Sequence, residues 1–471
     1  MMATMHRGFR LLSPCAWIAL AVSAALSGCA GTGPQAPLRA AEVLQQAAVA
    51  AQLPVGALAA ADAPSLAWRD WLREPRLQQW VELALQHNRD LRVALLNVQR
   101  AQAQLGLVDA NRLPTLGVGL NAGRAPNFKG VEATGLSAGL QVSTWEVDLY
   151  GRLASLSDAA RAQLLSTEAG RQAVALSVVA AVVQAGLSLQ ADEELLALAR
   201  QSLASREQTL ALTRLRESVG AASQLELQAQ LTLAAQARAV LAQLTRQQAQ
   251  DGNALALLLG QPLPARTASV SPALADETWL AEVPVGLSSA VLLRRPDVIA
   301  AEQTMRAAQA NIAAARAAFW PTISLTGQAG QASSQLSGLL QGGTFVYALA
   351  ANALLTVFDA GRRQANVAAA EAAQLVAQAQ YERAIQSAFR DTADALAGLA
   401  TWRDQLAAQR EQRDAARDTA RLTELKAAQG AASTLERLDA QRALWAAEQS
   451  VVQVRLAELA NRVALYKALG G

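Results

Sequence analysis

One stretch of the chain alternates apolar residues with small or polar ones and is free of charge. Pro321–Phe358 contains no Asp, Glu, Lys or Arg, although 17% of the whole sequence is charged. Its two alternating runs, Pro321–Ala332 and Phe345–Phe358, flank a centre rich in Ser and Gly. Period-two alternation on both sides of a polar loop predicts a β-hairpin. A membrane explains such an uncharged strand pair between water-soluble helices, whereas a soluble core does not.

A weaker counterpart of this strand pair lies earlier in the chain. A polar loop at 124–133 separates two alternating runs, and each run has one apolar face. The apolar positions are Leu116, Val118, Leu120, Leu136, Ala138, Leu140 and Val142. The sequence therefore predicts a second hairpin of the same kind.

Long helical patterns flank both hairpins. From Leu77 to Asn111 a pattern rich in Ala, Gln and Leu runs unbroken, and we expect Pro114 to mark its end. The tract Gly151–Glu217 contains no proline. At 1.5 Å per residue a helix of that length spans roughly 100 Å, far more than a globular domain needs.

The sequence contains an internal repeat, so that one unit occurs twice. Five matched positions recur at an offset of 207 residues before the hairpins and 210 after them, which places a small net insertion in the second hairpin region, most simply its loop. The matches are Asp90 with Asp297, Pro114 with Pro321, Gly151 with Gly361, Val219 with Gln429 and Leu259 with Leu469. A nearly constant offset over this length indicates duplication of one unit.

These observations give the following domain prediction. Residues 1–28 are a signal peptide, and 29–76 are a tether leading into an equatorial region. The first repeat, 77–260, has a helix, a hairpin at 113–149, a long helix at 151–217, a turn at 218–223 and a helix to 259. Residues 261–288 are a linker. The second repeat, 289–471, has a helix, a hairpin at 321–358, a long helix at 360–428, a turn at 429–433 and a helix to 469.

The uncharged runs fit membrane strands better than a membrane helix. Phe345–Phe358 has 14 residues, whereas a helix needs about 20 to cross a bilayer and a strand needs about 9–11. Two hairpins give four strands, and four strands cannot close into a barrel. Open edges in lipid leave backbone groups unsatisfied at several kcal/mol each, so the chain must form an oligomer. This argument does not fix the number of subunits.

Aromatic residues gather where strands meet helices. Trp145, Phe319, Trp320 and Phe358 all lie at the helix-proximal ends of the predicted strands. In a membrane barrel these positions form an interfacial girdle. The alternative is that they cover the helix–strand junction in a soluble core.

The N-terminus has the pattern of a bacterial lipoprotein signal. Basic residues precede the apolar run Leu11–Leu26, and the ending Leu-Ser-Gly-Cys at 26–29 resembles a lipobox. Cys29 is then the predicted lipidation site, since several acyl chains make a lasting anchor. Ordinary signal cleavage nearby, which leaves Cys29 as a free thiol, is the alternative.

The residue inventory argues against enzyme chemistry. After signal removal one cysteine, Cys29, and one histidine, His87, remain, too few for a metal cluster or a Cys–His pair. His87 sits in a helical pattern and is predicted to be a surface or capping residue. No phosphate-binding loop occurs, and the net charge of +3 comes mostly from scattered arginines. We expect no enzyme activity, cofactor, metal or nucleic-acid partner.

Several motifs resemble the outer-membrane factors of the TolC/OprM type, in the lipoprotein (NodT-like) efflux branch. The most specific are Arg295-Pro296-Asp297, Phe319-Trp320-Pro321-Thr322, the stretch Trp145–Arg152, the stretch Phe358–Arg362 and the two Gly-Ala-Ala-Ser turns. The resemblance covers essentially the whole mature chain. It implies a mixed α and β membrane protein, with four transmembrane strands and long helical hairpins per protomer. It further implies a homotrimer, whose 12-stranded β-barrel continues into a 12-helix periplasmic α-barrel.

The same resemblance implies a function. The protein would be the passive outer-membrane exit duct of a tripartite efflux system, anchored in outer-membrane lipid and extending into the periplasm. Its expected partners are a periplasmic membrane-fusion adaptor and an inner-membrane, proton-driven pump of the RND type.

The tips of the long helices are the expected adaptor contact and periplasmic gate. The residues concerned are Arg216, Glu217, Gly220, Ser223, Lys426, Gly430 and Ser433. Relatives often carry a tyrosine after the basic residue at each tip, where this chain has Glu217 and Ala427. We therefore expect different gate contacts, with Arg216 and Glu217 as candidates. The glycines also serve simply to reverse the chain.

Two other functions remain open on the sequence. An exit duct for a secreted protein shares the fold, and the lipobox favours small-molecule efflux over it. A periplasmic coiled-coil scaffold shares the long helices and the lipid anchor, but it does not explain two uncharged strand pairs.

Overall fold

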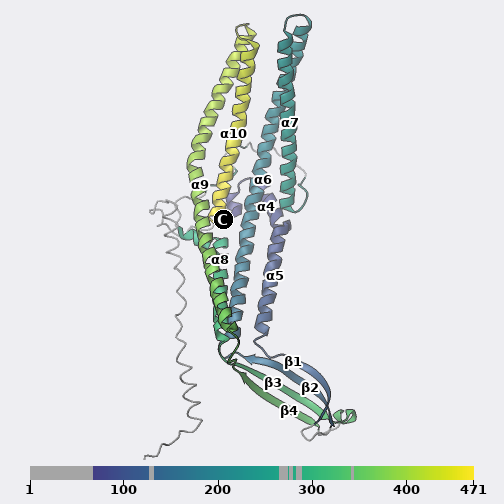
Figure 1. Ribbon diagram of the computed structural model, residues 1–471. Coiled ribbons are helices and arrows are strands. Elements are labelled where there is room, and N and C mark those ends of the chain that lie inside the picture. Colours follow the sequence, from purple (N-terminus) through teal and green to yellow (C-terminus); the bar gives the residue numbers. More distant parts are fainter. Residues whose placement is uncertain (1–66, 127–131, 265–273, 275–278, 283–288, 341–343) are drawn as a thin grey trace, which may run out of the picture. The chain divides into compact units, whose positions relative to one another are not determined.

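The computed structural model describes residues 67–126, 132–264, 274, 279–282, 289–340 and 344–471 (Figure 1). These residues fall within one compact unit, Leu44–Gly471. The predicted signal peptide and Cys29 lie outside the described residues.

The first repeat consists of helices on either side of two strands. The elements are α3 (Trp68–Trp71), α4 (Pro75–His87), α5 (Arg89–Ala110), β1 (Leu116–Pro126), β2 (Glu132–Val147), α6 (Arg152–Ser218) and α7 (Gln224–Leu259).

The second repeat has the same order of long elements. Its elements are η2 (Ser289–Arg294), α8 (Pro296–Ala317), β3 (Thr322–Ser333), η3 (Leu336–Leu340), β4 (Phe345–Leu354), α9 (Arg362–Ala428) and α10 (Thr434–Ala468). The short 3-10 helix η3 lies in the connection between β3 and β4, the region where the offset places extra residues.

Each repeat folds its two longest helices into an antiparallel pair. Figure 1 shows α6 beside α7 and α9 beside α10. The shorter helices extend these pairs, since α5 packs on α6 and α8 packs on both α6 and α9. The long helices α6 and α9 have 67 residues each and contain no proline, which agrees with the uninterrupted patterns in the sequence.

The helix expected to run unbroken from Leu77 to Asn111 is in fact two helices, so that prediction was wrong. Asn88 has extended backbone angles (φ −59°, ψ 131°), ends α4 and caps α5. Its side-chain Oδ1 accepts a hydrogen bond from Leu91 N at 2.9 Å. An Asn that caps a helix start competes with helix continuation, which explains the break.

The two repeats use equivalent positions to tie their first and last helices together. Asn88 Nδ2 donates to the carbonyl of Leu258 at 2.8 Å. In the second repeat the buried Arg295 donates from Nη1 to the carbonyl of Ala468 at 3.1 Å. The donors are 207 residues apart and the acceptors 210 apart, the same offsets that relate the repeats. A short amide and a long guanidinium therefore perform the same structural task.

A hydrophobic core of the described residues joins three distant parts of the sequence. Trp71, Trp279 and Leu280 are almost completely buried, and Leu72 forms an isolated antiparallel bridge with Leu280. The rings of Trp71 and Tyr466 stack with centroids 4.0 Å apart. The N-terminal segment, the linker and the C-terminal helix thus pack together against α6.

One helix in the described part of the chain, α6, is long and apolar enough to cross a membrane on length and composition alone. Its apolar residues Val182, Val183 and Leu187 are fully buried in the core just described. Packing within the protein therefore accounts for part of the apolar character of α6, since 39% of its most apolar window is buried.

Candidate functional site

The four strands form one sheet that leaves two open edges. Neighbouring strands are antiparallel and follow the order β1-β2-β3-β4, so the sheet joins the two repeats through β2 and β3. Within the described chain β1 and β4 each pair on one side only. β1 and β4 also run in opposite directions, because three successive antiparallel pairings separate them.

The register collects most of the large apolar side chains of the four strands on one face. Val118 lies opposite Leu140, Leu140 opposite Ala329 and Ala329 opposite Tyr347, and directly opposed residues point the same way. This apolar face comprises Leu116, Val118, Leu120, Leu136, Leu140, Val142, Trp145, Val147, Ile323, Leu325, Phe345, Tyr347 and Leu349.

Much of the apolar face is uncovered in the single chain. Val118 and Leu349 are 84% and 83% exposed, and Tyr347 is 74% exposed. A monomeric soluble protein rarely exposes a contiguous apolar patch of this kind. The face has the character of a lipid-contacting surface.

The opposite face is mostly small and polar. It comprises Gly117, Gly119, Asn121, Ser137, Gly139, Gln141, Ser324, Thr326, Gln328, Gly330 and Asn352, and β4 adds Val346 and Leu354. At the seam between the repeats, Gly139 and Gly330 are paired. A Cβ on either residue would overlap the backbone carbonyl of the adjoining strand, so only glycine fits there.

The last predicted strand ends earlier than expected. β4 stops at Leu354 instead of continuing to Phe358, and α9 begins at Arg362 instead of 360. Between them Ala360 and Gly361 have left-handed backbone angles, with φ of 55° and 84°. These angles reverse the chain direction and are incompatible with a strand.

Three of the four predicted girdle aromatics contact the helix–strand junction. Trp145 Nε1 donates to the carbonyl of Arg112, which follows α5, at 3.1 Å. The guanidinium of Arg363 lies 5.2 Å from the ring centroid of Phe319.

Trp320 makes its contact with a residue of the motif Trp145–Arg152 that the sequence analysis did not place in the girdle. Its ring stacks on Tyr150 at 5.2 Å. Tyr150 follows β2 closely, so its place near Trp145 in the sequence was the available signal. Phe358 differs from the others, because it is 85% exposed and lies beyond the end of β4.

The tips of the two helix pairs have the same backbone construction. Gly220 has φ of +73°, and its N–H donates to the carbonyl of Glu217 at 2.9 Å, while Ala221 N donates to the carbonyl of Arg216 at 2.7 Å. In the second repeat Gly430 has the same φ and Ala431 N donates to Lys426 O at 2.8 Å. This pair of bonds is a Schellman motif, which requires a left-handed residue and so favours glycine.

The serine of each tip starts the returning helix. Glu226 N donates to Ser223 Oγ at 3.1 Å, and Ser223 N donates back to Glu226 Oε2 at 3.0 Å. Ser433 and Glu436 make the same two bonds at 3.2 and 2.7 Å. The sequence analysis missed both glutamates, although Ser-x-x-Glu is the signature of this capping box.

The predicted tip residues lie together in the two turns that connect the long helices, and most of their side chains are exposed to solvent. No ion pair in the described part of the chain involves Arg216 or Glu217. Apolar side chains accompany them, with Val219 71% and Leu225 80% exposed. A tip of this kind offers an apolar surface with a few charges.

Nothing in the described chain resembles a metal site. No group of three or more His, Cys, Asp or Glu side chains among the described residues is placed to hold an ion. His87 is exposed and is the last residue of α4, at the place where a capping or surface role was predicted.

Comparison with known families identifies the duplicated unit. A family model described as outer membrane efflux protein matches residues 80–261 and again residues 287–471. The two matched segments correspond to the two structural repeats.

Two similar proteins of known sequence come from pseudomonads. The chain is 39% identical over 439 residues to the probable efflux pump outer membrane protein TtgC of Pseudomonas putida, covering 90% of each chain. It is 38% identical over 414 residues to the outer membrane protein OprJ of Pseudomonas aeruginosa, covering 86% of each chain.

Solved structures agree with the fold. The crystal structure of a membrane protein from Pseudomonas aeruginosa matches with a TM-score of 0.81 at 36% identity, over 89% of this chain and 96% of that chain. The open state of the Neisseria gonorrhoeae MtrE outer membrane channel matches with a TM-score of 0.79 at 35% identity, over 88% and 94% of the two chains.

Proposed function

Because the chain belongs to the outer membrane efflux protein family, we propose that it is the exit duct of a tripartite efflux system. It passively conducts drugs or other small molecules across the outer membrane. An inner-membrane pump of the RND type supplies the energy, and a periplasmic adaptor connects the two. The chain itself performs no catalysis and needs no cofactor.

The observation that carries this proposal is a sheet with one apolar face and two open edges. In lipid, the unpaired backbone groups of β1 and β4 would cost several kcal/mol each. Because β1 and β4 run in opposite directions, β4 of one protomer pairs with β1 of the next and continues the antiparallel pattern. Three protomers complete a barrel of twelve strands, above the minimum of about eight.

The face assignment gives the barrel its two surfaces. The apolar face, with Val118 and Leu349, contacts lipid, and the face with Gln141 and Gln328 lines the lumen. Trp145, Phe319, Trp320 and Phe358 lie at the membrane interface.

The helices, the core and the tips form the periplasmic part of the proposed duct. The helix pairs form the periplasmic tube, and the core around Trp71 and Trp279 is the equatorial region. Cys29 carries the lipid anchor. The tips at Gly220 and Gly430 meet the adaptor and hold the resting gate, with exposed leucines and valine for helix contact.

Two measurements on the purified full chain test the proposal. Unheated gel electrophoresis after detergent extraction should show a heat-modifiable trimer, and planar bilayers should show single channels. A monomeric protein without channel activity would contradict the barrel proposal.

The gate hypothesis has its own test at Glu217. Removing a charge that helps close the tip should raise single-channel conductance or open probability in Glu217→Ala. The control is Glu207→Ala, since Glu207 lies on the same helix and pairs with Arg238 at 3.4 Å. Unchanged conductance in Glu217→Ala excludes Glu217 from the gate without affecting the barrel proposal.

A further inference from the structure

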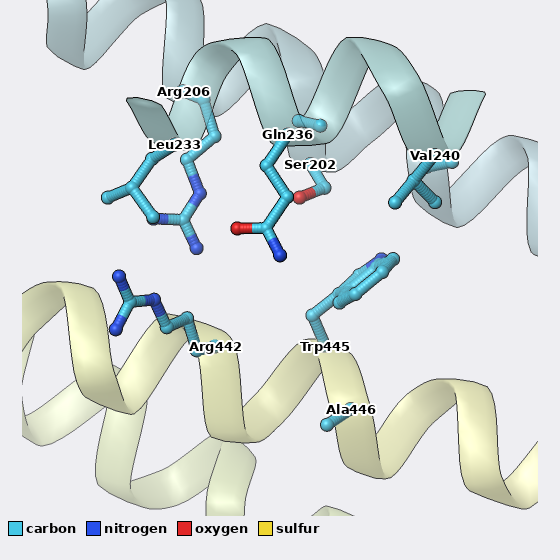
Figure 2. Close-up of a pocket in the computed structure, with 10 residues that line it drawn as sticks. Ser202, Arg206, Leu233, Gln236, Val240, Arg442, Trp445 and Ala446 are labelled. Atoms are coloured by element: carbon cyan, nitrogen blue, oxygen red, sulfur yellow. The ribbon is translucent and has the colours of Figure 1, made fainter. Parts of the chain in front are cut away.

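A cleft of about 420 Å³ opens between the two helix pairs, away from both the strands and the tips. It is lined by α6, α7 and α10 (Figure 2). Figure 2 shows the guanidinium groups of Arg206 and Arg442 facing one another at one end of this cleft, with Gln236 beside them and Trp445 at the other end.

Arg206 is the unusual member of the group. Its side chain is almost completely buried, with 7% of the residue exposed, and its buried Nη1 has no hydrogen-bond partner among the described residues. Burial and then the nearby charge of Arg442 lower the pKa of Arg206. An arginine remains protonated nevertheless, so the chain buries a positive charge beside another one.

The acidic side chains close by do not neutralise Arg206. Glu207, the next residue, pairs with Arg238 on α7 at 3.4 Å. Asp439 pairs with Arg442 at 3.1 Å, and both of these side chains are more than half exposed. A buried, uncompensated guanidinium with free donors is costly unless an anion joins it.

The other end of the cleft is apolar and carries a free donor. Trp445 presents its ring beside Val240, and its buried Nε1 has no hydrogen-bond partner in the described structure. The cleft therefore has a cationic end and an aromatic end, and its volume lies in the range of small-molecule sites.

Comparison of the two repeats shows that Arg206, Arg442 and Trp445 are not shared between them. At the repeat offset of 210, Arg206, Arg442 and Trp445 correspond to Ala416, Thr232 and Ala235. Arg206 comes from the first repeat, and Arg442 and Trp445 come from the second. Each helical hairpin therefore forms in the other repeat without a cation or an indole at the equivalent position, so the three side chains need a reason that is local to this cleft.

We propose that this cleft binds a small organic anion. Its carboxylate or phosphate group lies between Arg206 and Arg442, and its apolar part packs on Trp445 and Val240. Arg is suited to this task because its planar fork binds such groups through two parallel hydrogen bonds. The proposal concerns the isolated protein and does not depend on its partners or on conduction.

Benzoate and benzamide form a matched pair of probes for the full-length protein in detergent. They have nearly the same shape, and only benzoate carries a charge. Titration at constant ionic strength, followed by calorimetry and by tryptophan fluorescence, should show saturable binding of benzoate that is about tenfold or more tighter than that of benzamide. Inorganic phosphate should compete with benzoate.

Variants separate the two ends of the cleft. Arg442→Gln, at a side chain that is 52% exposed, should abolish most of the preference for benzoate over benzamide. Trp445→Leu should weaken the binding of benzoate. The affinity for inorganic phosphate, measured by competition, should stay the same. Arg206→Lys should retain part of the affinity, and Arg214→Gln, on the exposed side of α6, should match the wild type.

Three results would overturn the proposal. The first is benzoate binding no tighter than benzamide. The second is equal loss of binding in Arg214→Gln and Arg442→Gln. The third is that no anion binds, while Arg206→Gln dissociates the trimer, because an acidic side chain of a neighbouring protomer would then be the partner of Arg206.

Discussion

At the residue scale, Asp192 on α6 is a buried carboxyl with an acidic neighbour. Only 6% of the residue is exposed, and its Oδ2 has no hydrogen-bond partner in the described chain. Burial, followed by a hydrogen bond with Asp251 and the charge of Asp251, raises the pKa of Asp192 to about 7. Asp251 on α7 also accepts a hydrogen bond from Gln247 at 3.0 Å.

This pair predicts a pH dependence of stability. The folded chain keeps a proton on Asp192 that the unfolded chain releases near pH 4, so folding stability should fall as the pH rises from about 4 to about 7 and then level off. Asp192→Asn, which keeps the shape without the charge, should remove this component and raise the melting temperature at pH 8 more than at pH 5.

Thermal unfolding of both proteins at several pH values measures the effect. Asp251→Asn is a second variant that removes the neighbouring charge and should act in the same direction. Parallel pH profiles of wild type and Asp192→Asn would show that Asp192 is ionised throughout and would contradict the pKa shift.

Buried charged residues such as Asp192 and Arg206 could not be predicted from the sequence. Asp192 lies in the run Asp-Glu-Glu, which reads as a solvated helix face. Arg206 likewise resembled the many arginines spread along helices. Their burial depends on α7 and α10, which are distant in sequence, so helical periodicity could not reveal it.

At the element scale, the two tips are the most regular local structures in the protein. A Schellman motif ends each long helix and a capping box starts the returning one, between Arg216 and Glu226 at one tip and between Lys426 and Glu436 at the other. Both motifs are encoded locally, which is why the turns at 218–223 and 429–433 could be placed from Gly and Ser alone.

The caps predict a local loss of stability on mutation. Ser223→Ala and Ser433→Ala should each cost about 1 kcal/mol, because each leaves a backbone N–H of the first helical turn without its acceptor. Hydrogen exchange should therefore speed up in the first turn of α7 or α10. Ser218→Ala is the control, since Ser218 is exposed and bonds only to the carbonyl of Leu215. Equal exchange in the cap variants and the control would refute the capping role.

Other elements show where local patterns fail. Proline-free tracts placed α6 and α9 to within two residues at each end. The break at Asn88 was missed because an Asn inside an apolar helical pattern is compatible with a continuous helix, although its side chain caps α5 at Leu91 and also bonds to the carbonyl of Leu258 across 170 residues. The early end of β4 was missed because Leu355–Phe358 remains apolar, while the backbone turns at Ala360 and Gly361.

At the scale of the whole molecule, the sheet is incomplete by itself. The sequence predicted four strands and an oligomer, and the structure adds their order and register. It places β1 and β4 at the edges and collects most of the large apolar side chains on one face. Neither property followed from alternation alone, because a period of two defines faces within a strand but not which strands are neighbours.

Cysteine cross-linking between edge strands tests the account most directly. Pairs that combine Val118→Cys or Leu120→Cys in β1 with Leu349→Cys or Ala351→Cys in β4 sample neighbouring registers on the apolar face. The account predicts that at least one pair, oxidised in outer-membrane fractions, gives a covalent trimer on denaturing gels. Control pairs of Val118→Cys with Leu325→Cys in the interior strand β3 should give none. Only monomers from every edge pair, or equal cross-linking from the controls, would contradict a barrel shared between chains.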